Sequence, residues 1–177
     1  NTSGATAQGV KQYAPMVEAA TSTHYFYDGA QCKMEDQNIV SANIRMADSC
    51  FFDVFPQKIL IGKAKQILSQ PLSCLIDSEM AAKIGGNVVG KHFTLSNYPG
   101  TTFTIYGVFE AFPWGSSFHG TQMILSMCSV PYVYSYDGRG QWVGNDSYRS
   151  YIRLAKGHEA KELKPYVNKM REDHFPL

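Results

Sequence analysis

The chain has 177 residues, a formal net charge of +1 from 16 basic and 15 acidic side chains, and an aromatic content of 13%. This length allows one substantial core or two small lobes, and the charged fraction of 18% with many aromatic residues excludes a disordered, highly charged segment. The balanced charge provides no basic surface that would indicate nucleic-acid binding. No apolar run is long enough to cross a bilayer.

The first third of the chain predicts one helix followed by two strands. The stretch QGVKQYA at residues 8–14 is typical of a short helix that ends at Pro15, because proline lacks an N–H and restricts the residue before it. A strand around THYFYDG leads into a polar turn, and the period-two alternation of NIVSANIRMAD predicts a half-buried strand. The inward-facing side chains of that strand are Val40, Ala42, Ile44 and Met46.

An aromatic cluster and a short capped helix follow in the middle of the chain. The phenylalanines at positions 51–55 should anchor a core, at about 2 kcal/mol for each buried ring. The stretch SCLID predicts a buried strand, and SEMAAKIGG predicts a helix with Asp77 or Ser78 as its N-cap. Gly85 is the residue type that ends helices in the left-handed conformation.

The stretch GGNVVGKH at residues 85–92 has the spacing of a phosphate-binding loop, with Gly85, four residues, Gly90 and Lys91. Such a loop follows a strand and opens a helix, because the N–H groups at the helix N-terminus bind the phosphates. Here a predicted helix precedes the glycines, a strand-like KHFTLS follows them, and His92 occupies the position of the Mg²⁺-binding hydroxyl. We therefore interpret the stretch as a helix stop and a turn rather than a nucleotide site.

The C-terminal half predicts strands in TTFTIYGVFEAF, TQMILSM and SYRSYIRLA, with a loop at PWGSSFHG. In VPYVYSY, Pro131 cannot donate to a strand ladder, so an edge strand or an extended loop is predicted there. The tyrosine row of this stretch either packs on the core or forms a contact surface. The last predicted helix spans GHEAKELKPYVNKMREDHF, where Pro165 requires that the helix begin near Glu162 or kink.

No residue pattern supports a catalytic, metal or cofactor site. The cysteines are Cys32, Cys50, Cys74 and Cys128, and the histidines lie at positions 24, 92, 119, 158 and 174. The cysteines lack C-x-x-C spacing, so buried free thiols are one interpretation and disulfides in an oxidising compartment are the other. The histidines lack ligand spacing, and no nucleophile elbow surrounds Ser116 or Ser117. Asp48 and Asp53 are interpreted as turn or cap residues.

Four long segments, taken in order, carry a family resemblance. They are ADSCFFDVFPQKILIGKAKQILSQPLSCLIDSEMAAKIGG, VVGKHFTL, FTIYGVFEAFPWGSSFH and SYIRLAKGHEAKELK. Together they resemble the MacB-like periplasmic core domain of FtsX-type permeases of ABC transporters, from about residue 10 to residue 170. The chain departs from the family pattern at Cys50, Cys74 and Ala111, and residues 131–145 match no segment of the pattern.

The resemblance implies an α+β fold with mixed sheets, helices packed on them, and two lobes of which one is inserted into the other. It implies a discontinuous, porter-like α+β lobe from residues 1–47 and 120–177, and an inserted, mostly β lobe with one helix at residues 48–119. It also implies a position between membrane helices, on the periplasmic side of the bacterial inner membrane. Because the chain does not begin with Met, we expect a soluble piece of a longer membrane protein.

The function implied by the resemblance is non-catalytic mechanotransmission that couples cytoplasmic ATP hydrolysis to export or efflux. The implied partners are the membrane helices of the same permease, a cytoplasmic ABC ATPase, a second permease copy, and a periplasmic adaptor or substrate. No cofactor, metal or nucleic acid is implied. One alternative is a periplasmic ligand-binding or sensor domain in which rings of residues 132–142 line a pocket, and another is a secreted hydrolase.

Loop aromatics are the candidate partner contacts, because exposed aromatic side chains contribute strongly to interfaces. The candidates are Trp114, Phe118, Tyr134 and Trp142. The competing interpretation is that these four rings close the core. The sequence does not decide between the two roles.

Overall fold

The computed structural model describes residues 1–175 and combines helices with a mixed sheet, which confirms the α+β class. In chain order the elements are α1 (Thr6–Tyr13), β1 (Val17–Met34), β2 (Ile39–Ala47), α2 (Phe51–Val54), β3 (Ile59–Ile61), α3 (Ala64–Ile67), β4 (Ser73–Asp77), α4 (Ser78–Ile84), β5 (His92–Leu95), β6 (Tyr98–Phe109), β7 (Met123–Ser126), η1 (Met127–Ser129), α5 (Val130–Val133), β8 (Tyr148–Leu154), η2 (Ala160–Leu163) and α6 (Lys164–His174). Within residues 1–175, no helix has the length and apolar character needed to span a membrane. Pro176 and Leu177, at the end of the expected discontinuous lobe, lie outside the described residues.

The chain folds as two compact units, each assembled from segments that are separated in the sequence. Unit 1 contains Asn1–His24, Cys50–Pro56 and the described residues from Asp137 onward, and unit 2 contains Tyr25–Ser49 and Gln57–Tyr136. Strand β1 contributes its first part to unit 1 and its second part to unit 2.

The boundaries of these units differ from those of the expected lobes, which were residues 1–47 with 120–177 and residues 48–119. Strand β7 pairs in parallel with β2 and antiparallel with β4, so all three strands belong to unit 2. Helix α2 contacts β8 and lies in unit 1. Pairing between segments that are distant in the sequence sets these boundaries, and no local sequence pattern reports such pairing.

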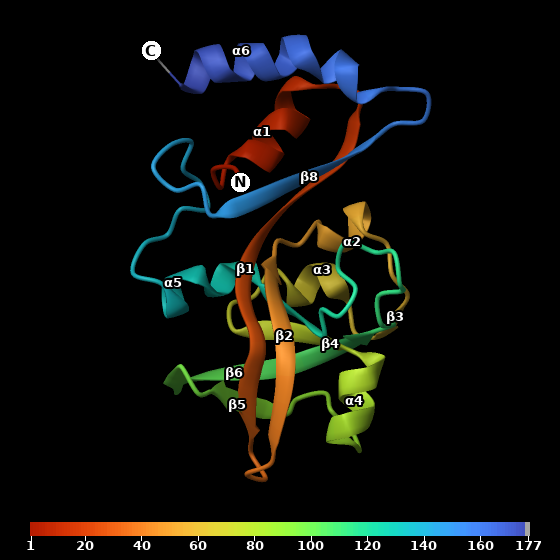
Figure 1. The fold of residues 1–177 in the computed structure, drawn as a ribbon, viewed down its shortest axis with the longest axis vertical. Helices are drawn as coiled ribbons and strands as arrows, with labels where there is room; N and C mark the ends of the chain where they lie inside the picture. Colours follow the sequence, from red (N-terminus) through yellow and green to blue (C-terminus); the bar gives the residue numbers. More distant parts are fainter. Residues whose placement is uncertain (176–177) are drawn as a thin grey trace. The chain divides into compact units, whose positions relative to one another are not determined.

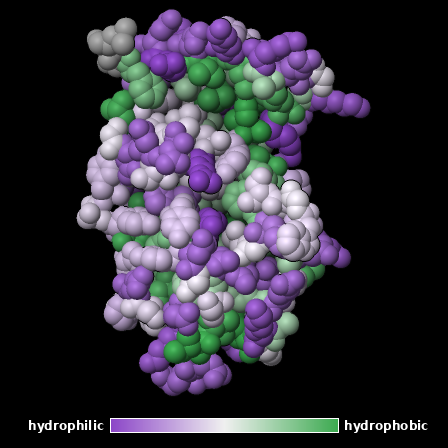
Figure 2. Space-filling view, in the orientation of Figure 1, coloured by the Kyte–Doolittle hydropathy of each residue, from purple (hydrophilic) through white to green (hydrophobic). Residues whose placement is uncertain are grey.

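Unit 1 is built on the packing of α1 against α6, beside a ladder between β1 and β8. Figure 1 shows α6 lying across α1. Residues 17–24 of β1 pair antiparallel with β8. The outer surface of α6 is hydrophilic, and hydrophobic residues gather between α6 and α1 (Figure 2). The buried core consists of Ala7, Val10, Ala14, Met16, Val17, Ala20 and Met170.

The strands of unit 2 close on themselves. The pairing runs from β1 to β2, β7, β4, β6 and β5, and from β5 back to β1. Figure 1 shows β1 and β2 as a long pair of neighbouring strands within this arrangement. Closure satisfies the backbone groups along strand edges. Strand β3 lies outside the ring and pairs only with β6 among the described residues, so β3 retains a free edge.

Strand β4 is buried on both faces, as the apolar stretch SCLID predicted. It pairs in parallel with β6 and antiparallel with β7. Asp77 ends the strand, and its carboxylate accepts a hydrogen bond of 2.7 Å from the backbone N–H of Met80. Asp77 is therefore the N-cap of α4, one of the two residues that the sequence offered for this role.

The end of α4 confirms the interpretation of GGNVVGKH as a helix stop and a turn. Gly85 follows the helix with a φ of +78°, and Gly90 precedes β5 with a φ of +88°. Both values lie in the region that glycine adopts at little steric cost. The Lys91 ammonium donates a hydrogen bond of 3.1 Å to the Gly85 carbonyl, so this lysine serves the turn itself.

Two segments in the C-terminal half settle or correct the sequence-based predictions. The prediction of an edge strand or extended loop at VPYVYSY is wrong for residues 130–133, which form α5. Pro131 lies in the first turn of α5, where a missing N–H breaks no intrahelical bond. Pro165 likewise lies in the first turn of α6, which begins at Lys164 after the 3₁₀ turn η2, so the helix does not kink there.

Removal of the Asp77 side chain tests the cap of α4. We expect Asp77→Ala to lower the free energy of unfolding by about 1–2 kcal/mol, because the Met80 N–H loses its acceptor in a buried position. Asp77→Asn, which keeps an oxygen acceptor, should retain most of this stability. Urea denaturation monitored by circular dichroism measures both variants, and equal stability of the alanine and asparagine variants would contradict the capping role.

The titration of Asp77 predicts a pH dependence of stability. Burial raises the pKa of the Asp77 carboxyl above its usual value. The native state then holds a proton that the unfolded chain has already released, so the contribution of Asp77 to stability falls as pH rises from about pH 4 through the raised pKa. Urea denaturation of the wild type and Asp77→Asn between about pH 4 and pH 6 should show the wild type losing stability relative to the variant. A relative gain by the wild type would contradict the sign.

Candidate partner-contact site

Trp114 is the most exposed of the four candidate contact residues. Its side chain is 88% exposed, and its indole stacks on the imidazole of His119 with ring centroids 4.3 Å apart and planes at 27°. The Nδ1 atom of His119 lies 3.2 Å from the carbonyl oxygen of Phe112, to which a protonated Nδ1 donates a hydrogen bond. His119 therefore supports one face of the exposed indole and leaves the other face open to a partner.

Side-chain amides hold both ends of the loop that carries Trp114, residues 110–122. At its start, the Gln57 amide donates hydrogen bonds of 3.0 and 3.1 Å to two consecutive backbone carbonyls. Near its end, the Asn43 amide donates a hydrogen bond of 2.9 Å to the carbonyl of Gly120. Because the loop is anchored before binding, a partner that contacts Trp114 loses less conformational entropy in ordering it.

Phe118 lies in the same loop but belongs to the core of unit 2. Its side chain is 5% exposed, and its ring packs against Phe112 with centroids 5.8 Å apart. Phe112 packs in turn against Phe109 of β6 at 5.2 Å. Phe118 therefore holds the loop onto unit 2 and offers no surface to a partner in this structure.

Tyr134 is partly buried in an aromatic cluster of unit 2. Its ring meets the ring of Phe26 edge-on at 6.2 Å, and Phe26 stacks on Tyr98 at 5.7 Å. Burial, followed by a hydrogen bond with Tyr27, raises the pKa of the Tyr98 hydroxyl to about 12. The Tyr98 hydroxyl is therefore neutral at physiological pH, and Tyr134 has a packing role with part of its ring exposed.

Trp142 lies in unit 1 and fastens α1 to α6. Its indole stacks on the imidazole of His174 with centroids 3.7 Å apart and planes at 7°. A Cβ atom at Gly9 would overlap the Trp142 ring and would approach the Met170 sulfur to 2.9 Å. Glycine at this position of α1 thus makes room for the indole, and Trp142 closes the core of unit 1.

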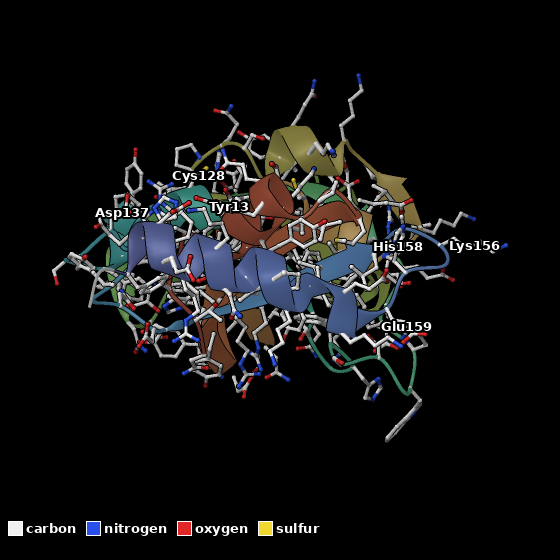
Figure 3. All side chains as sticks on the ribbon, turned by 90° about the horizontal axis from the view of Figure 1, so that it is seen from above. Tyr13, Cys128, Asp137, Lys156, His158 and Glu159 are labelled. Carbon is white, nitrogen blue, oxygen red and sulfur yellow. The ribbon has the colours of Figure 1, made fainter. Side chains whose placement is uncertain are left out.

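A polar cluster surrounds this contact between α1 and α6. The Tyr13 hydroxyl donates a hydrogen bond of 2.9 Å to one carboxylate oxygen of Asp173, and the Lys169 ammonium lies 2.7 Å from the other. Figure 3, which shows the structure from above relative to Figure 1, places the labelled Tyr13 beside α6. The bond from Lys169 lowers the pKa of the Asp173 carboxyl, and Asp173 raises the pKa of the Tyr13 hydroxyl. The bond between Tyr13 and Asp173 joins α1 to α6, whereas the pair of Lys169 and Asp173 lies within α6. Both shifts therefore arise from exposed pairwise contacts with a structural role.

The connection between β8 and η2 also gathers charged groups, and Figure 3 labels Lys156, His158 and Glu159 there. Glu159 and Glu162 form a reciprocal capping box, and His158 pairs with Glu162 at 3.3 Å. This arrangement starts η2 and needs no ligand to explain it.

The two most buried cysteines, Cys32 and Cys74, are unsuited to nucleophilic chemistry. No disulfide joins any of the four cysteines, all of which the structure describes. Burial raises the pKa of Cys32 to about 12, and it raises the pKa of Cys74 well above its usual range. A thiol that stays protonated is a poor nucleophile and a poor metal ligand. Among residues 1–175, no group of three or more His, Cys, Asp or Glu side chains is placed to hold a metal ion.

The role of His119 was not predicted from the sequence, where this histidine was a candidate metal ligand only. In the structure, its ring supports Trp114. A Trp and a His that flank a turn rich in glycine and serine, as in PWGSSFHG, would have been a usable signal. Trp142 belongs to unit 1, and the other three candidates belong to unit 2.

Comparison with known proteins confirms the resemblance. The sequence matches the family described as the MacB-like periplasmic core domain over residues 2–169. The chain therefore belongs to this family of extracytoplasmic domains of ABC transporter permeases. A comparison with curated proteins gave no match.

Solved structures that are similar to this chain include three domains of permease or transporter proteins. A domain of a protein assigned as a permease from Porphyromonas gingivalis has a TM-score of 0.84 and 29% sequence identity, and the match covers 98% of this chain and 71% of that one. The periplasmic region of MacB from Actinobacillus actinomycetemcomitans has a TM-score of 0.68 at 12% identity, covering 98% and 75%. The extracellular domain of the noncanonic ABC-type transporter YknZ from Gram-positive bacteria has a TM-score of 0.62 at 12% identity, covering 97% and 85%. The last two similarities establish the fold alone.

The different environments of the two tryptophans predict different effects on stability. Trp142→Ala should lower the free energy of unfolding by about 2–3 kcal/mol, because it empties a packed position between α1 and α6. Trp114→Ala should change it by no more than about 0.5 kcal/mol, because the indole is almost fully exposed. Chemical denaturation of both variants measures the difference. A reversal of this order would show that the two roles are assigned incorrectly.

Proposed function

We propose that this domain is a non-catalytic coupling element of an ABC transporter permease. In this proposal, ATP hydrolysis in the cytoplasm moves the membrane helices of the permease, and these helices change the state of the domain on the periplasmic side. The domain then acts on a periplasmic substrate, adaptor or enzyme during export or efflux. Membership of the MacB-like family supports the setting, and the exposed, pre-positioned Trp114 supports a contact with a partner.

The chemistry of the domain supports placing ATP hydrolysis elsewhere. The only phosphate-loop-like spacing in the sequence is at GGNVVGKH, where Lys91 bonds the Gly85 carbonyl and a helix comes before the glycines. Both features serve a turn rather than a triphosphate. In this proposal, an ABC ATPase in the cytoplasm therefore hydrolyses the ATP. A second copy of the permease is the other proposed partner of this domain.

Trp114 is the residue that we assign to the partner contact. A flat aromatic ring on an anchored loop contributes large contact area at low entropy cost, which is typical of residues that dominate binding energy. Phe118 and Trp142 have packing roles within their own units, and Tyr134 is partly buried. The ligand-binding alternative assigned rings from residues 132–142 to a pocket, whereas Tyr134 packs in the aromatic cluster of unit 2 and Trp142 packs on the core of unit 1.

Transport by the intact permease with its ATPase tests the coupling role. Trp114→Ala should reduce transport at least about ten-fold, as expected for an aromatic contact that dominates an interface. It should leave the melting temperature and the basal ATPase rate of the transporter unchanged. Trp114→Phe, which keeps a flat ring, should restore much of the transport. Unchanged transport in the alanine variant would overturn the assignment of Trp114.

The non-catalytic part of the proposal has a separate test. The purified 177-residue chain should show no ATP hydrolysis above the background of a Lys91→Ala variant. A hydrolysis rate that disappears in Lys91→Ala would overturn the interpretation of GGNVVGKH and the assignment of catalysis to another subunit. A malachite green assay for released phosphate measures this directly.

A further inference from the structure

A groove with a volume of about 560 Å³ lies in unit 2, apart from the loop that carries Trp114. Its walls come from the turn after β3, from α3, from the segment leading into β4, and from β6. Gly62, Lys63, Ile67, Pro71 and Tyr106 are among its lining residues. None of these residues has a role in the coupling function proposed above.

The groove continues into exposed apolar surface. Tyr106, which lines the groove from β6, is 46% exposed. Leu60 and Ile61 of β3 are 45% and 46% exposed, although neighbouring residues of a strand point to opposite faces. Neither face of β3 is therefore covered. Large apolar side chains that gather beside a groove are typical of binding surfaces.

Strand β3 also offers backbone groups for pairing. The other strands of unit 2 form the closed ring, whereas β3 pairs only with β6 among the described residues. Free strand edges are sites where another extended chain can add itself by backbone hydrogen bonds. The apolar groove begins where β3 ends, because its lining residue Gly62 follows β3 directly.

The charge around the groove indicates what kind of chain would bind. The residues that line the groove include Lys63 but no Asp or Glu. Lys58 and Lys65 lie nearby in the sequence, and Glu110 lies opposite Lys58, before the start of β3. Lys63 lines the groove and is exposed, and it forms no ion pair with any described residue. The surface therefore combines apolar side chains with one exposed lysine, Lys63, at the groove.

We propose that β3 and this groove bind an extended, acidic segment of a partner protein. The partner backbone pairs with the free edge of β3, one apolar side chain rests against Tyr106 and Ile67, and an acidic side chain reaches Lys63. Charge complementarity selects acidic over basic segments, and the strand edge selects an extended over a helical conformation. The inference concerns binding alone and holds whether or not Trp114 contributes to transport.

Titration of the isotopically labelled 177-residue chain with a blocked heptapeptide of alternating Glu and Val tests the proposal by NMR. We expect saturable shifts of the amide signals of residues 59–63 and 106. The matched peptide with Lys in place of Glu should bind at least about ten-fold more weakly, because it places like charges beside Lys63. A Glu-Val peptide that is N-methylated at alternate residues should also bind more weakly, because it lacks donors for the β3 edge.

Two lysine variants complete the test. Lys63→Glu should weaken binding of the Glu-Val peptide by about five-fold or more, and it should improve binding of the Lys-Val peptide. Lys156→Glu reverses the charge of an exposed lysine in unit 1 and should leave both affinities unchanged. Both lysines are exposed, so neither variant should impair folding.

Several results would overturn the proposal. Equal affinity for the two peptides, or shifts that avoid residues 59–63, would exclude an acidic segment on β3. Shifts at the groove with submicellar dodecyl sulfate but not with the Glu-Val peptide would indicate a site for an anionic amphiphile instead. Shifts of β3 signals that depend on protein concentration, without peptide, would indicate that a second copy of this chain occupies the edge.

Discussion

The burial of β4 on both faces is the constraint on which unit 2 depends. Every backbone N–H and C=O of such a strand must find a partner, because unpaired polar groups in an apolar interior are costly. Parallel pairing with β6 and antiparallel pairing with β7 meet this requirement, and both partners come from later in the chain. The ring of strands then closes through β5, β1 and β2. At the end of β4, the buried carboxylate of Asp77 finds its donor in the first turn of α4.

Packing against the strands of unit 2 sets which aromatic side chains of its loop are buried and which are exposed. Phe118 and Trp114 are four residues apart in one loop, yet Phe118 is buried against Phe112 and Trp114 is exposed. The buried phenyl ring of Phe118 anchors the loop, and the His119 imidazole supports the exposed indole of Trp114. The same principle operates in unit 1, where Gly9 leaves room for Trp142 and removes that indole from the candidate contact surface.

The fold of this family persists at low sequence identity. TM-scores of 0.68 and 0.62 accompany only 12% identity, so the backbone arrangement is compatible with very different side chains. Similarity to these two structures therefore establishes the fold alone, while partners depend on the side chains that each chain displays. In unit 2, these are the indole of Trp114 and the groove beside β3, which Lys63 lines.

Local patterns in the sequence predicted most of the individual elements. Period-two alternation predicted β2, a continuous apolar run predicted β4, and capping residues predicted the start and end of α4. These features depend on neighbours along the chain, which is why they can be read from it. The short helix α5 was not predicted. Pro131 was considered only as a residue that disrupts a strand, although proline is also compatible with the first turn of a helix.

The sequence by itself therefore determined the class of fold, the order of most elements, the role of GGNVVGKH as a turn, and the family. Only the tertiary structure decided the boundaries of the two units, because strand pairing between distant segments leaves no local pattern. It also separated Trp114 from Phe118, because the burial of a loop side chain depends on packing partners elsewhere in the chain. The free edge of β3 has the same origin, since a strand has an open edge only with respect to the sheet that other strands complete.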